Sequence, residues 1–118
     1  MATPPPGCRV PLFSYGTLQL EAVQRRQFGR LLEGVADAVV GYRAIEVEIL
    51  DEAVVVLSGL RFHLSIVETG DPRDEVAGML YLITEAELAA ADDYEVEDYR
   101  RIEVPLKSGR TAWVYAMR

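Results

Sequence analysis

The sequence contains very little of what several protein classes require. Cys8 is the only cysteine and His63 the only histidine among 118 residues. An intramolecular disulfide and a cysteine-based zinc site are therefore excluded, and we expect no metal or cofactor. No apolar run approaches the ~20 residues that span a bilayer. The N-terminus also lacks the basic start and apolar stretch of a signal peptide. We therefore expect a reduced, cytoplasmic domain with no membrane partner.

Positive charge is also scarce. Twelve Lys and Arg against nineteen Asp and Glu give a net charge of −7 at pH 7. This balance argues against a nucleic-acid partner, which needs a basic surface. Residues 85–98 hold seven of the acids and no base, and the remaining acids equal the bases in number. The whole negative excess therefore lies in one short segment.

The rest of the composition is ordinary for a globular protein, because half of the residues are apolar and about a quarter are charged. The length predicts one domain. Residues 1–9 include three consecutive prolines, so we expect a disordered tail there and a single domain over residues 10–118.

Local patterns predict the elements of this domain. Residues 10–15 and 64–67 are strand candidates, and residues 39–49 contain an alternation typical of a half-buried strand. Residues 54–57 and 76–83 have the character of buried strands, and residues 101–104 and 111–115 that of a closing hairpin. Residues 20–32 predict a helix whose inward stripe is Leu20, Val23, Gln27 and Leu31. Thr84 and Glu87 form a capping box, which predicts a second helix over residues 85–91. The fold class is α+β, with a small mixed, barrel-like sheet of six to seven strands and two helices.

One candidate site is a turn between the first strand and the first helix, formed by Tyr15, Gly16, Thr17 and Leu18 (the 15–18 loop). Amides at such a turn can converge on one point, and the helix start favours a carboxylate or phosphate. The alternative is a plain turn in which Gly16 supplies a positive φ.

A second candidate is the acidic segment. Asp92, Asp93 and Glu95 stand where the second helix ends, and there the helix dipole disfavours anions. Crowded carboxylates titrate high, as a general acid or base near neutral pH must. The alternative is a solvated acidic loop. Trp113 and Tyr115 alternate with Val114, so both face one side of a strand, either in the core or lining a pocket.

Several motifs, in chain order, resemble the γ-glutamylcyclotransferase-like family, which includes the plant avirulence-induced-gene proteins. Residues 12–18 are similar to the family's opening strand and Tyr-Gly-Thr/Ser loop, and residues 76–81 to its Val-x-Gly-x-Leu-Tyr strand. Residues 87–95 resemble Glu-Leu-x-x-Leu-Asp-x-Tyr-Glu, residues 99–101 fit Tyr-x-Arg, and residues 112–115 fit the last strand.

The resemblance implies an enzyme that cyclises the γ-glutamyl group of a small amine or peptide substrate. It releases 5-oxoproline and a free amine, without a metal. Glu95 would be the catalytic carboxylate. The 15–18 loop would hold the substrate, and Tyr115 would line the pocket. The family often has glycine where this chain has Val96, and leucine where it has Ala91. These departures leave open the alternative of a non-catalytic protein that binds a small ligand or a partner on the same fold.

Overall fold

The computed structural model describes residues 7–48, 52–53, 56, 62–94 and 99–117. Within the expected tail, the thiol of Cys8 contacts Arg30 Nη2 at 3.4 Å. Among the described residues, no helix is long and apolar enough to cross a membrane. The elements in chain order are β1 (Val10–Ser14), the 3₁₀ turn η1 (Thr17–Gln19), α1 (Glu21–Phe28), β2 (Gly34–Val40), β3 (Tyr42–Glu48), β4 (Phe62–Glu68), β5 (Glu75–Ile83), α3 (Glu85–Tyr94), β6 (Tyr99–Pro105) and β7 (Thr111–Met117).

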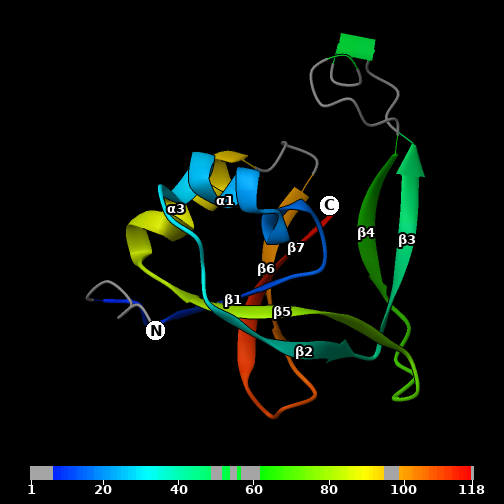
Figure 1. The fold of residues 1–118 in the computed structure, drawn as a ribbon. Coiled ribbons are helices and arrows are strands. Elements are labelled where there is room, and N and C mark those ends of the chain that lie inside the picture. The colour runs from blue at the N-terminus through cyan, green and yellow to red at the C-terminus, as the bar shows by residue number, and fades with distance from the viewer. Residues whose placement is uncertain (1–6, 49–51, 54–55, 57–61, 95–98, 118) are drawn as a thin grey trace.

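Five strands form one curled sheet in the order β2-β5-β1-β7-β6, and β3 pairs with β4 in a separate ribbon beside it (Figure 1). Within the five-stranded sheet β1 and β7 run parallel, and the other neighbours are antiparallel. Val39 of edge strand β2 bridges to Leu106, directly after edge strand β6. The sheet therefore curls until its edges touch at this seam without closing fully. This confirms the mixed, barrel-like α+β architecture.

Apolar side chains pack on both faces of the curled sheet. Leu12 and Phe13 are neighbours in β1 with almost no exposed surface, and they belong to different core clusters. The cluster of Phe13 includes Ile66 of β4, so it joins the ribbon to the sheet. The cluster of Leu12 includes Leu88 and Ala91 of α3. β1 is thus buried on both faces, which explains why its sequence is almost continuously apolar.

α3 begins at the predicted capping box. The amide of Glu87 donates to Thr84 Oγ1 at 3.0 Å, and the amide of Thr84 donates to Glu87 Oε1 at 2.9 Å. Both otherwise unpaired amides at the helix start are satisfied, as the motif predicts. α3 then runs to Tyr94, three residues beyond the predicted end.

α1 is shorter than predicted, and its inward face is different. Gly29, with φ 70°, ends the helix in the left-handed conformation that glycine favours. Leu20 is 56% exposed and Leu31 39% exposed, so the predicted stripe is wrong at both positions. Gln24 is buried instead, donating to the Leu18 carbonyl at 2.9 Å and accepting from the Leu32 amide at 2.9 Å. A buried glutamine whose side chain bridges backbone groups is not predicted by the spacing of apolar residues.

The predicted strand over residues 39–49 is in fact two strands, because β2 ends at Val40 and β3 begins at Tyr42. Gly41 between them has a φ of 83° and makes the turn. The predicted strand over residues 54–57 lies outside the described residues except for Val56, which is helical, so that prediction is wrong there. The strands predicted at 64–67, 76–83, 101–104 and 111–115 are confirmed, each slightly longer than expected.

Candidate active site

The 15–18 loop follows β1 directly and lies at the end of β7. β1 and β7 are parallel neighbours, with Leu12 paired to Trp113, so Ser14 and Tyr115 lie at the same level. The buried side chain of Leu18 anchors the end of the loop in the second core cluster. The strands β1 and β7, which are far apart in the sequence, thus bring the predicted loop and Tyr115 together.

Two hydrogen bonds hold the loop. The Tyr15 hydroxyl donates to the Tyr115 carbonyl at 2.6 Å, and the hydroxyls of Thr17 and Tyr94 lie 2.6 Å apart. The first bond ties the loop to β7 and the second ties it to the last residue of α3. The structure therefore brings the 15–18 loop, Tyr115 and the end of α3 to one place.

Gly16 has a φ of −133°, so the positive φ that the plain-turn alternative assigned to it is wrong. A Cβ at this position would meet no described atom within 4 Å. The amides of Gln19 and Leu20 bond back to the carbonyls of Gly16 and Thr17. In the described part of the chain, the amides of Thr17 and Leu18 have no such partner. The loop thus combines open space over Gly16 with two available donors, which suits an anionic or carbonyl oxygen.

Tyr115 is buried, and its hydroxyl donates to Asp92 Oδ1 at 2.6 Å. Arg101 Nε lies 3.4 Å from the same oxygen, and the Arg101 guanidinium lies 4.5 Å above the ring of Trp113. Trp113 and Tyr115 both pack in the cluster under the helices, which confirms that they share one face. Tyr115 therefore supports the loop through its carbonyl and α3 through its hydroxyl. A direct contact with substrate stays a prediction.

Glu95, the predicted catalytic carboxylate, lies outside the described residues. Its preceding neighbour, Tyr94, is the α3 residue that contacts Thr17. Tyr99, the next described residue along the chain, pairs with Met117 at the end of β7. The described residues on both sides of the 95–98 segment therefore lie at the same end of β7 as the loop.

Gly78 has a role that the sequence analysis missed. It lies in β5 beside the end of β1, where a Cβ would collide with the Ser14 carbonyl oxygen and come within 2.7 Å of Phe13 Cζ. Only glycine lets the two strands approach this closely at the start of the loop. The available signal was the glycine inside an otherwise apolar strand, at residues 76–83.

An ion pair fixes the other end of α3. Arg30 Nε lies 2.8 Å from Glu87 Oε2, and Arg30 Nη2 lies 3.0 Å from Oε1. Burial acts to raise the pKa of Glu87, but the hydrogen bonds from Arg30 and the Thr84 amide outweigh it and hold that pKa below its usual value. The same contact raises the pKa of Arg30. This ion pair, the Arg30–Glu87 clamp, thus reinforces the capping box.

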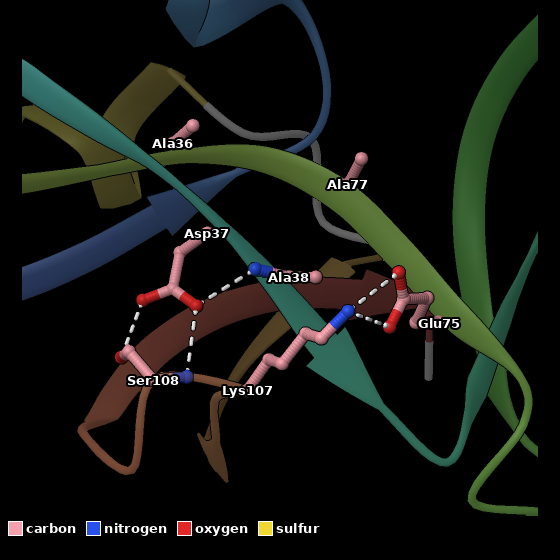
Figure 2. A pocket seen from close by; sticks show the side chains of 7 residues that line it. All are labelled: Ala36, Asp37, Ala38, Glu75, Ala77, Lys107 and Ser108. Atoms are coloured by element: carbon pink, nitrogen blue, oxygen red, sulfur yellow. Dashed lines mark hydrogen bonds and ion pairs between the residues drawn. The ribbon is translucent and has the colours of Figure 1, made fainter.

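The seam of the sheet carries an open hollow of about 410 Å³, which Figure 2 shows. Lys107 Nζ lies 3.2 Å from Glu75 Oε2, and Ser108 Oγ donates to Asp37 Oδ2 at 2.6 Å. The polar groups on its walls pair with one another across the seam, so we interpret them as stabilising the seam. None of the predicted site residues that the structure describes lines it. The lining residues are Ala36, Asp37, Ala38, Glu75, Ala77, Lys107 and Ser108.

The curled sheet, the helix pair and the loop define a γ-glutamylcyclotransferase-like fold. A solved structure described as gamma-glutamyl cyclotransferase matches with a TM-score of 0.71 at 16% identity, covering 92% of this chain and 66% of that chain. A protein from Arabidopsis thaliana solved in solution has a TM-score of 0.71 at 22% identity, covering 99% and 66%. An uncharacterized protein from Homo sapiens has a TM-score of 0.70 at 19% identity, covering 92% and 66%. At these identities the likeness shows a shared fold.

The family model described as "Gamma-glutamyl cyclotransferase, AIG2-like" matches residues 12–118, so the chain belongs to this family. It spans about two thirds of the length of the solved structures named above. None of the curated protein sequences matches it.

Proposed function

We propose that the chain cyclises the γ-glutamyl group of a small γ-glutamyl amine or peptide. The α-amine of the substrate attacks its own γ-carbonyl carbon and forms a new C–N bond. The bond from that carbon to the departing nitrogen breaks, which gives 5-oxoproline and a free amine. Membership of the cyclotransferase family supports this reaction class.

The 15–18 loop is the proposed substrate cradle. The observation that carries this assignment is the open space over Gly16 beside the amides of Thr17 and Leu18, which bond to no other described residue. Backbone donors there can bind a carboxylate or carbonyl oxygen of the γ-glutamyl group and bend it into a ring-closing conformation. Holding the reacting atoms close together supplies much of what an intramolecular reaction needs.

Glu95 is the proposed proton carrier. The attacking amine must lose a proton and the departing nitrogen must gain one, and a single carboxylate can perform both transfers. In support, Glu95 follows Tyr94, whose hydroxyl contacts the loop at Thr17. Tyr115 is proposed to complete the wall of the site behind the loop.

The test is incubation of the chain with a panel of γ-glutamyl amines and dipeptides, with 5-oxoproline and the released amine both quantified. The matched α-glutamyl dipeptides are the control, because their cyclisation does not release the second amine. We expect equal amounts of the two products from γ-linked substrates alone. Saturable binding of γ-linked compounds without turnover would instead support the non-catalytic alternative. Release of neither product, with no binding, would contradict both.

A further inference from the structure

Asp92 occupies a position that its own helix does not favour. It lies in the last turn of α3, which contains no basic residue. An anion there opposes the partial negative charge of the helix end. Asp93 has the same disadvantage. It is exposed, and its side chain has no hydrogen bond or ion pair with another described residue. The two neighbours therefore differ only in what surrounds them.

The partners of Asp92 come from two strands. Tyr115 of β7 donates its hydroxyl at 2.6 Å, and Arg101 of β6 contributes its guanidinium at 3.4 Å. Arg101 and Tyr115 are directly opposite each other in the β6–β7 register. Both side chains therefore stand on one face of the sheet and meet the carboxylate together. The contact fixes the end of α3 on the two strands.

The guanidinium of Arg101 is held in place independently of Asp92. It stacks over Trp113 at 4.5 Å, and its Nη1 is buried with no hydrogen-bond partner among the described residues. A cation held this way presents its charge to Asp92, its one ion-pair partner among the described residues. Asp92 is 42% exposed, and an ion pair with that much solvent contributes little to stability. Its main effect is therefore on geometry.

We propose that Asp92 is a positioning residue of the site. Asp92 accepts a hydrogen bond from the Tyr115 hydroxyl, and the Tyr115 carbonyl accepts one from the Tyr15 hydroxyl. These two hydrogen bonds connect the end of α3, next to the proposed proton carrier, with the start of the substrate loop. This inference rests on the proposed function. It adds that the ionised Asp92–Arg101 pair sets how the acid–base residue meets the bound substrate.

The test compares Asp92→Asn with Asp93→Asn, the same chemical change one residue away. Asparagine at 92 keeps an oxygen for Tyr115 and loses the charge paired with Arg101. We expect kcat for 5-oxoproline release to fall about 10- to 100-fold in Asp92→Asn, because small misplacements of reacting groups have effects of this size. KM should stay within about threefold, since the 15–18 loop keeps its own anchors. Asp93→Asn should change neither constant.

Tyr115→Phe is the second variant. It removes one hydroxyl and keeps the charges of Asp92 and Arg101, so it also tests the positioning role if Asp92→Asn does not fold. It should lower kcat with an unchanged KM and a native melting temperature. Equal kcat in Asp92→Asn and Asp93→Asn, or a wild-type kcat in Tyr115→Phe, would overturn the positioning role while leaving the proposed function intact. Absence of 5-oxoproline release by the wild-type chain from every γ-glutamyl substrate would overturn the proposed function, and this role with it.

Discussion

The hydroxyls of Thr17 and Tyr94 lie 2.6 Å apart, although the two residues are 77 positions apart in the chain. This contact joins the start of η1 to the end of α3. It is the described contact closest in sequence to Glu95, and it connects the substrate loop with the acidic segment. The proposed reaction requires these two parts to keep their relative position.

Removing the hydroxyl of Thr17 tests that contact directly. Thr17→Val keeps the shape and loses the hydrogen bond to Tyr94, so we expect a loss of about 1 kcal/mol in unfolding free energy. Activity should fall further than this loss alone explains, because the loop and α3 are no longer tied. Thr17→Ser retains a hydroxyl and is the control. Steady-state kinetics with urea unfolding separates the two effects, and equal kcat/KM in the Val and Ser variants would contradict the prediction.

Gly16→Ala should affect binding and leave stability unchanged. The φ of −133° lies outside the left-handed region, and no described atom lies within 4 Å of the new Cβ. Unfolding free energy should change by about 0.5 kcal/mol or less. The added methyl group projects into the space proposed for the γ-glutamyl group, so KM should rise about tenfold. An unchanged KM would show that the substrate does not approach this residue.

Gly78→Ala, unlike Gly16→Ala, should lower the unfolding free energy. Its Cβ would collide with the Ser14 carbonyl oxygen and the Phe13 ring, and backbone atoms cannot move aside as a flexible side chain can. We expect at least about 1–3 kcal/mol of destabilisation, the range for overpacked cores. Thermal or urea unfolding is the measurement. A variant as stable as the wild type would mean that β1 and β5 can separate here without cost.

The sequence predicted the elements whose signals are local. The capping box at Thr84 and Glu87 located the start of α3, because both hydrogen bonds form within three residues. The strands with clear alternation or turn chemistry at their ends were also predicted. The barrel-like sheet was predicted from the order of elements and from the resemblance, but the β1–β7 pairing itself joins residues about 100 positions apart and leaves no local pattern.

Tertiary contacts explain the parts that were missed. Gln24 is buried because it bridges the backbones of Leu18 and Leu32, so a polar residue occupies an inward position that periodicity gives to leucine. The plain-turn alternative gave Gly16 a positive φ, but the residue caps the 3₁₀ turn that follows it with a φ of −133°. Asp92 was grouped with the crowded acids, whereas Arg101 and Tyr115 partner it from strands that a linear pattern does not connect.

The Arg30–Glu87 clamp predicts a pH dependence of stability. Folding favours the ionised Glu87, whose pKa lies below its usual 4.5 in the folded chain. The contribution is therefore complete above about pH 4.5 and is lost as pH falls through the lower folded value. Glu87→Gln should unfold about 1 kcal/mol more easily at pH 7, and the gap should narrow by pH 3.

Glu85→Gln is the control for this clamp, because Glu85 lies in the same helical turn without an ion pair in the described residues. It should lose about 0.5 kcal/mol or less at pH 7. Urea unfolding of both variants and the wild type at the two pH values provides the measurement. A gap for Glu87→Gln that is the same at pH 7 and pH 3 would show that its charge contributes nothing to stability.

The most direct test of the central claim is 5-oxoproline release by Glu95→Gln beside Glu97→Gln. Glutamine matches glutamate in size and cannot carry the proton between the attacking and departing nitrogens. We expect Glu95→Gln to fold with a native melting temperature and to lose turnover by about 10²-fold or more, while Glu97→Gln keeps the wild-type rate. A Glu95→Gln variant that releases 5-oxoproline at close to the wild-type rate would contradict the assignment of Glu95 as the proton carrier.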